Sequence, residues 1–186
     1  MEQITLENVI PEIFSNLPQL ESGIWGKEVI FSRGHLYLIE AASGKGKTSF
    51  CSYIYGSRKD YEGKISFDST TITSFSEHHW GEIHRNHLGM LFQGLCLFPE
   101  LTALENVLLK NQLTGYKNEK WIRESFERLG IGDKLDAIVA RISFGQQQRV
   151  ALIRGLCQPL DFILLDEPVS HLDDVNSRLA GELLLE

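Results

Sequence analysis

Apolar residues recur along the chain with two periods, and the two kinds of segment follow one another in turn. Strand-like alternation or short apolar runs occupy 4–9, 29–31, 36–40, 63–67, 88–92 and 161–165. Helical spacing occupies 48–55, 77–86, 103–109, 119–129 and 146–157. The run at 161–165 is apolar after its aspartate, so we expect the most clearly buried strand there, in the centre of a parallel sheet. Strands that alternate with helices predict an α/β fold.

Composition fits one globular domain and limits its partners. The chain has 186 residues, of which 42% are hydrophobic and 23% charged. Its net charge of −7, from 18 basic and 25 acidic residues, argues against a general nucleic-acid-binding surface. The amino terminus lacks a signal-peptide pattern and no long apolar run is free of charge, so we expect neither a secretory signal nor a membrane span. The widely spaced cysteines, without a C-x-x-C pair, favour a reducing cytosol over a disulfide framework or a zinc site: Cys51, Cys96 and Cys157.

A glycine- and lysine-containing octamer follows the apolar run at 36–40. It reads Ala41-Ala42-Ser43-Gly44-Lys45-Gly46-Lys47-Thr48 and fits the phosphate-binding pattern G-x-x-x-x-G-K-[ST] at every fixed position except the first. In such a loop the backbone N–H groups face the phosphates, Lys47 reaches the outer phosphates, and the Thr48 hydroxyl ligates Mg²⁺. An octamer of these residues also arises by chance in exposed loops. We expect a nucleoside triphosphate with Mg²⁺ to bind here, with Ala41 weakening it somewhat because alanine disfavours positive φ.

Two adjacent carboxylates follow the apolar run at 161–165. Ligands of open α/β sheets bind at the carboxyl ends of strands, which is where Asp166 and Glu167 lie. Asp166 is expected to hold Mg²⁺, and Glu167 to polarise an attacking water. The alternative is a solvated acidic turn, and the phosphate loop earlier in the chain favours the catalytic interpretation.

Further segments resemble the ATP-binding cassette (ABC) ATPases. The segment 142–152, Ile-Ser-Phe-Gly-Gln-Gln-Gln-Arg-Val-Ala-Leu, is similar to the L-S-G-G-Q signature of that family and the Q-Q-R-V-A that follows it. Met90–Gln93 and the segment 97–107 resemble its Q-loop region, and Ser170–Asp173 resembles its D-loop. The resemblance implies a P-loop NTPase fold: a mostly parallel sheet flanked by helices, an amino-terminal antiparallel region and an inserted helical subdomain. It also implies one domain over 1–186, divided into a core with the phosphate loop (1–93), a helical subdomain (94–157) and the acid strand with the D-loop (158–186).

The same resemblance assigns site residues. Lys47, Gln93 and Glu167 become the catalytic residues, and Thr48, Gln93 and Asp166 the Mg²⁺ ligands. Contacts with ATP are expected from the whole loop through Ser49, and an aromatic residue should stack on adenine, with Phe14 the first choice and Trp25 the second. In this family two copies pack head to tail, so that the signature and D-loop residues of one copy close on the ATP held by the other: Ser143, Gly145, Gln146 and Asp173. Ser143 is also expected to cap the helix that follows it.

Three departures from the family pattern bear on turnover. Ala41 replaces a glycine, and Phe144 stands where the signature usually has glycine, either crowding a phosphate or pointing away from it. The family also uses a histidine beyond the next helix, and this chain stops before that position, so we expect an incomplete carboxyl-terminal core and an incomplete catalytic set. The four histidines between 78 and 87 are expected on an exposed helix rather than around a metal.

The preferred hypothesis is the ATPase subunit of an ABC transporter, similar to the lipoprotein-releasing and macrolide-exporter branch on the segment 85–107. Such a subunit forms a homodimer and drives a separate integral membrane permease from the cytoplasmic face of the plasma membrane. One alternative is a nucleotide-dependent dimerisation switch with little hydrolysis. Another is a soluble ABC protein of repair or translation, but those carry long insertions or tandem cassettes. No nucleic-acid partner is expected.

Overall fold

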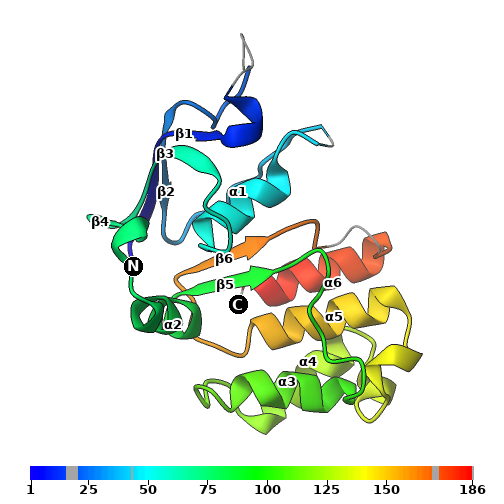
Figure 1. Cartoon of the computed structure of the whole chain (residues 1–186). Coiled ribbons are helices and arrows are strands. Elements are labelled where there is room, and N and C mark those ends of the chain that lie inside the picture. Colours follow the sequence, from blue (N-terminus) through cyan, green and yellow to red (C-terminus); the bar gives the residue numbers. More distant parts are fainter. Residues whose placement is uncertain (16–20, 43, 169–171, 186) are drawn as a thin grey trace. The chain divides into compact units, whose positions relative to one another are not determined.

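The computed structural model describes residues 1–15, 21–42, 44–168 and 172–185 (Figure 1). These residues form two compact units, Met1–Leu88 and Gly89–Glu186. The phosphate loop belongs to the first unit, and the acid strand and signature belong to the second. The predicted division of one domain at residues 93 and 157 stays a prediction.

The first unit is built on a four-stranded antiparallel sheet with the order β2-β1-β3-β4. Its strands are β1 (Gln3–Pro11), β2 (Glu28–Ser32), β3 (Tyr61–Phe67) and β4 (Thr70–Thr71). In the central strand, Ile4 lies opposite Phe31 on one side and Phe67 on the other, and all three side chains are buried. The alternation of apolar and polar residues thus fixes the register, because a slip by one residue would turn the apolar side chains to the other face.

Two α-helices complete the part of the first unit that the structure describes. Helix α1 (Lys47–Ile54) follows the phosphate loop, and α2 (Glu77–Asn86) precedes the second unit. Short 3₁₀ turns lie at η1 (Glu12–Phe14) and η2 (Ile72–Ser74). Phe50 of α1 makes edge-to-face contacts with Phe31 of β2 and with Trp25, at centroid distances of 5.6 and 6.1 Å. Aromatic packing therefore attaches α1 to the sheet.

The strand predicted at 36–40 is absent, and that prediction is wrong for this structure. Leu36 and Leu38 are 86% and 83% exposed, and the segment pairs with no strand among the described residues. Tyr37 fixes it instead: its hydroxyl accepts a hydrogen bond from the Ser32 N–H at 2.9 Å, and its ring packs on Phe31 at 4.9 Å. An apolar run becomes a strand only where a neighbour satisfies its backbone groups, and no strand in the described ranges does so here.

The described residues of the second unit form a two-stranded sheet and four α-helices. Strands β5 (Leu88–Leu91) and β6 (Phe162–Leu165) run in the same direction (Figure 1). The helices are α3 (Ala103–Asn111), α4 (Glu119–Arg128), α5 (Phe144–Gly155) and α6 (Asp174–Leu184), with 3₁₀ turns η3 (Gly132–Lys134) and η4 (Val139–Arg141). Their core is formed by fully buried side chains of three helices and a loop: Val107, Ile122, Phe126, Ile131, Val150 and Ile153.

Strand β6 is less buried than the sequence predicts. All four of its residues are half-buried, because β5 is its one partner in the described part of the sheet. Buried instead is Asp166, directly after the strand, whose exposure is 5%. No helix among the described residues is long and apolar enough to cross a membrane.

Candidate nucleotide site

The amino terminus of α1 is open for an anion. Its N-cap is Gly46, with φ 92°, and among the described residues no side chain accepts a hydrogen bond from the first turn as a cap would. Gly44 is also left-handed, with φ 75°. The first N–H groups of a helix have no partner within the helix, and they carry the positive end of its dipole. A glycine-rich loop that leads into such an uncapped helix favours phosphate binding.

Lys47 lies over this loop. Its ammonium donates hydrogen bonds to the carbonyl oxygens of Ala41 at 2.8 Å and Ala42 at 3.5 Å. A phosphate in the loop would compete with these carbonyls for the same ammonium, because a charged acceptor makes the stronger hydrogen bond. Thr48 is exposed, and Ala41 is not left-handed, so its methyl group adds no backbone strain. Ser43 lies outside the described residues.

Both candidate adenine contacts lie beside Gly46. A Cβ atom on Gly46 would lie 3.2 Å from Trp25 and 3.3 Å from Phe14. Trp25 is 7% exposed, and its indole N–H donates to the Lys45 carbonyl at 3.4 Å. Phe14, at the end of η1, is half-buried. Trp25 therefore supports the loop from the core, and Phe14 has the more accessible ring for stacking on a base.

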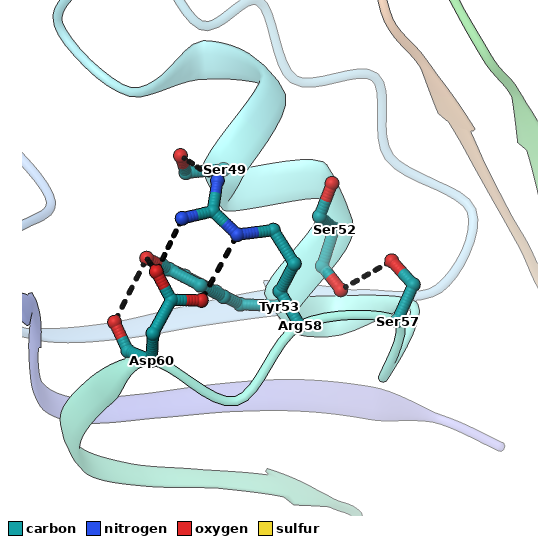
Figure 2. Close-up of polar contacts among 6 residues, drawn as sticks. All are labelled: Ser49, Ser52, Tyr53, Ser57, Arg58 and Asp60. Carbon is teal, nitrogen blue, oxygen red and sulfur yellow. Dashed lines mark hydrogen bonds and ion pairs between the residues drawn. The ribbon is translucent and has the colours of Figure 1, made fainter.

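A polar network that the sequence analysis missed secures the first turn of α1 (Figure 2). Arg58 donates to the Ser49 hydroxyl at 2.8 Å and to Asp60 through both Nε and a terminal nitrogen. Its guanidinium lies 5.3 Å from the centre of the Tyr53 ring, and the Tyr53 hydroxyl donates to the Asp60 carbonyl at 3.0 Å. The hydrogen bonds from Arg58 lower the pKa of Asp60, and burial raises the pKa of Tyr53. No spacing rule in the sequence signals this network.

Asp166 has the environment of a cation ligand. It follows β6, and its N–H donates to the Leu91 carbonyl of β5 at 3.1 Å. Its Oδ2 atom is buried and has no hydrogen-bond partner within the part of the chain that the structure describes. A buried carboxylate oxygen without a partner is costly, and an Mg²⁺ ion would satisfy it. Asp166 therefore fits the Mg²⁺ ion that the sequence implies.

Two further candidate residues accompany Asp166. Glu167 is the next residue in the chain, and Gln93 follows the neighbouring strand β5. Glu167 is exposed and has a positive φ of 54°, a strained conformation that often occurs at functional sites. Gln93 follows β5 and is exposed. Because β5 and β6 are parallel neighbours, the second unit brings Gln93 and the two carboxylates to one edge of its sheet.

The signature segment begins helix α5 with a complete capping box. The Ser143 hydroxyl accepts from the Gln146 N–H at 3.3 Å, and the Gln146 side chain accepts from the Ser143 N–H at 2.9 Å. The prediction that Ser143 caps this helix is confirmed, and the helix begins at Phe144 rather than at the predicted residue 146. Phe144 is 44% exposed, and Gly145 is half-buried in the same turn.

Asp173 is held in a second capped helix start. Its carboxylate accepts from the Asn176 N–H at 2.9 Å and from the Asn176 amide at 2.7 Å, and these bonds lower the pKa of Asp173. Arg149 of α5 donates to the Asn176 side chain at 2.8 Å and to the Leu129 carbonyl at 2.8 Å. Arg149 thus connects the signature helix to α6. Ser170 and His171 of the predicted D-loop lie outside the described residues.

The predicted site residues are divided between the two units. The phosphate loop with Phe14 and Trp25 belongs to the first unit. The acid pair and Gln93 share a sheet edge in the second, which also holds the signature and Asp173.

Comparisons with known proteins identify the family. The ABC transporter family profile matches residues 27–170. An uncharacterized ABC transporter ATP-binding protein of Mycobacterium tuberculosis, Rv0073, is 32% identical over all of this chain, which spans 57% of that relative's length. The lipoprotein-releasing system ATP-binding protein LolD of Alcanivorax borkumensis is 30% identical over 87% of this chain and 72% of its own.

Solved structures agree as well. The dimeric structure of MJ0796, a bacterial ABC transporter cassette, has a TM-score of 0.80 and 27% identity, and the match covers 97% of this chain and 81% of that one. A second MJ0796 structure, a dimeric post-hydrolysis state bound to ADP and Pi, has a TM-score of 0.72, 26% identity and the same coverage. Fold and motifs therefore define a P-loop α/β nucleotide-binding cassette. The chain belongs to the ABC transporter family, as an ATP-binding cassette.

Proposed function

We propose that this chain is the ATP-binding subunit of an ABC transporter and hydrolyses Mg-ATP to drive a separate membrane permease. The observation that carries hydrolysis is the buried Oδ2 of Asp166, which has no partner among the described residues and is followed by Glu167. A cation ligand beside a second, exposed carboxylate provides both charge neutralisation and a base. The similarity to the lipoprotein-releasing protein LolD supports the transport role.

In the proposed reaction the N–H groups at the start of α1 hold the phosphates. Lys47 exchanges its loop carbonyls for the outer phosphate oxygens and neutralises their charge. Thr48, Gln93 and Asp166 would hold Mg²⁺, which when bound neutralises charge on the β- and γ-phosphates. Glu167 accepts a proton from the water that attacks the γ-phosphorus, as the bond to the bridging oxygen breaks.

The proposed functional form is a head-to-tail dimer of two copies. Ser143 and Gly145 lie in the exposed first turn of α5, whose positive end favours an anion. In the dimer these groups, with Gln146 and Asp173, would close on the γ-phosphate held by the loop of the other copy. ATP would then join two identical surfaces, as two-fold symmetry allows. The permease would hold this dimer at the cytoplasmic face of the plasma membrane.

Steady-state ATPase assays of the full-length protein test the hydrolytic role. We expect Glu167→Gln to lower kcat by at least about 100-fold, because the amide cannot accept the proton, while ATP affinity is retained. Glu182→Gln is the matched control, since Glu182 is an exposed carboxylate of α6, and its turnover should equal that of the unchanged protein. Equal turnover in both variants would exclude Glu167 as the base.

A nucleotide-dependent switch is the second candidate, and Phe144 favours it. Its side chain is 44% exposed in the first turn of α5, between the two residues expected to meet the phosphate. An aromatic ring there can limit how closely a triphosphate approaches Ser143 and Gly145. ATP-dependent dimerisation without turnover in the full-length protein supports the switch, and turnover that rises in Phe144→Gly indicates an enzyme slowed by this residue.

A further inference from the structure

The turn that follows Gln93 has a strained backbone. Leu95 and Cys96 have positive φ angles of 56° and 50°, which residues with a Cβ atom disfavour. The turn is tight, because the Leu95 N–H donates to the Phe92 carbonyl at 2.9 Å and the Cys96 N–H donates to the Gly94 carbonyl at 2.6 Å. Two consecutive residues in this conformation persist only where surrounding contacts hold them.

Arg154, in the last turn of α5, supplies such contacts. One terminal nitrogen of its guanidinium donates to the Cys96 carbonyl at 2.6 Å, and the other donates to the Leu95 carbonyl at 2.7 Å. The planar fork of an arginine suits two neighbouring acceptors, and its charge strengthens both bonds. The two carbonyls it binds belong to the two strained residues.

The same helix carries the signature at its other end. Helix α5 runs from Phe144 to Gly155, with Ser143 as its N-cap, and its middle is buried in the core of the second unit. A single rigid element therefore connects the signature with the turn after Gln93. Beyond that turn, buried Asn106 binds both the N–H and the carbonyl of Phe98. The segment after Gln93 is thus held at two points.

We propose that Arg154 is a positioning residue that holds the turn 92–96 and so presents Gln93 to the metal and water at the sheet edge that it shares with Asp166 and Glu167. Displacement of the signature end of α5 would move the same helix that holds this turn. Loss of the guanidinium would release the strain at Leu95 and Cys96 and let Gln93 leave its position.

The test compares Arg154→Met with Arg154→Lys in the full-length protein. Arg123→Met is the control, because Arg123 is a surface residue whose guanidinium pairs with Glu119. We expect Arg154→Met to raise amide hydrogen exchange over 93–97 about tenfold and to lower kcat about tenfold. The affinity for ATP measured without Mg²⁺ should not change. Arg154→Lys should keep only part of the exchange protection and of kcat, since an ammonium is a point charge and lacks the two-pronged geometry of a guanidinium.

Substitution of the strained residue itself provides a second readout. Glycine accepts positive φ without cost, so Cys96→Gly added to Arg154→Met should recover at least half of the lost kcat. Cys96→Ala, which also removes the thiol but keeps the Cβ atom, should recover none. Equal recovery by glycine and alanine would overturn the proposal. So would hydrogen exchange over 93–97 that is unchanged in Arg154→Met.

This inference rests on the proposed function for the role of Gln93, and the two can fail separately. Turnover that persists in Glu167→Gln overturns the proposed catalytic base, and hydrogen exchange still decides whether Arg154 holds the turn. Faster exchange over 93–97 with a normal kcat overturns the positioning role. Slow turnover of Arg154→Met with unchanged hydrogen exchange over 93–97 also overturns the positioning role.

Discussion

Two helices of this cassette begin at a proposed phosphate contact, and their first turns differ. Helix α1 begins at left-handed Gly46, and no side chain in the described part of the chain caps it. Helix α5 begins at Ser143 with a capping box that its own residues complete. The first helix start leaves N–H groups for a ligand, whereas the second has already used two of its own.

This difference between the two helix starts suits two kinds of phosphate contact: one that binds nucleotide within a single copy, and one that meets the phosphate only in the dimer. The open turn of α1 gains most from an anion and should bind nucleotide first. It is held by Arg58 through Ser49 and by aromatic packing rather than by a cap. The capped turn of α5 is stable without a ligand, so it can remain unliganded until the second copy of the chain brings its ATP.

The largest expected effect comes from closing the open turn with a side chain. Gly46→Ala places a methyl group at φ 92° and within 3.3 Å of Phe14 and Trp25. We expect nucleotide affinity to fall at least about 100-fold, and the free energy of unfolding to fall by about 2 kcal/mol. Fluorescent-nucleotide titration and urea unfolding measure the two quantities.

The control is Gly81→Ala in α2. Apart from its chain neighbours and the backbone of its own helix, no described atom lies within 4 Å of a Cβ added to this glycine, and its φ is not positive. Alanine should raise the free energy of unfolding by about 0.5–1 kcal/mol and leave nucleotide affinity unchanged. Equal affinities in the two variants would mean that the turn of α1 does not hold the phosphates.

Asp166→Asn should separate stability from turnover. Removal of a buried negative charge whose Oδ2 lacks a partner in the described residues relieves a desolvation cost. The free energy of unfolding without Mg²⁺ should stay the same or rise by about 1 kcal/mol, and turnover should fall at least about 100-fold. A variant that loses stability in urea would show that the carboxylate is needed by the fold itself.

Two variants of Ser143 separate its role as the cap of α5 from its proposed role as a phosphate contact. Ser143→Ala removes the cap and should lower the free energy of unfolding by about 1 kcal/mol. Ser143→Asp keeps the cap and adds a negative charge, so stability should hold while ATP-dependent dimerisation is lost. Nucleotide affinity of the monomer should stay normal in both. Dimerisation that survives in Ser143→Asp speaks against this helix start as an anion contact.

Cysteine alkylation compares how strongly ATP protects the two helices, and it requires no substitution. We expect it to show the smallest effect. Cys51 lies in α1 and Cys157 two residues after the end of α5, and both are buried, whereas Cys96 is exposed. At pH 8 we expect Cys96 to react first and Cys157 last, and added ATP to slow Cys51 more than Cys157, because the ligand stabilises α1. Mass spectrometry of the alkylated peptides gives the alkylation rates. If ATP protected Cys51 and Cys157 equally, the proposed difference between α1 and α5 in ligand stabilisation would be contradicted.

The pH dependence of the same thiol has a definite sign. Burial raises the pKa of Cys157 from 9.0 to about 12. The folded state therefore keeps the thiol proton at pH values where the unfolded chain has lost it. This stabilisation is complete below pH 9, and the free energy of unfolding should fall as the pH rises from 9 toward 12. Cys157→Ala should reduce that slope.

Much of the fold follows from local pattern. Every predicted helix forms, and the antiparallel strands pair in the register that their apolar residues require. Sequence fails at 36–40 and in the burial of β6, because strand formation depends on neighbours that a local pattern does not reveal. Motif spacing identified the loop, the acid pair and the signature. It could not identify Arg58 or Arg154, because neither arginine belongs to a motif and their roles depend on contacts between residues distant in the chain.

Sedimentation of the full-length Glu167→Gln variant tests the central claim, that ATP joins the open turn of one copy to the capped turn of another. Without nucleotide the variant should be a monomer, and with Mg-ATP it should sediment as a dimer. Adding Ser143→Asp to the same variant should return it to a monomer that still binds ATP. A Glu167→Gln protein that stays monomeric at saturating Mg-ATP, or a dimer that forms equally well with Ser143→Asp, would contradict the account.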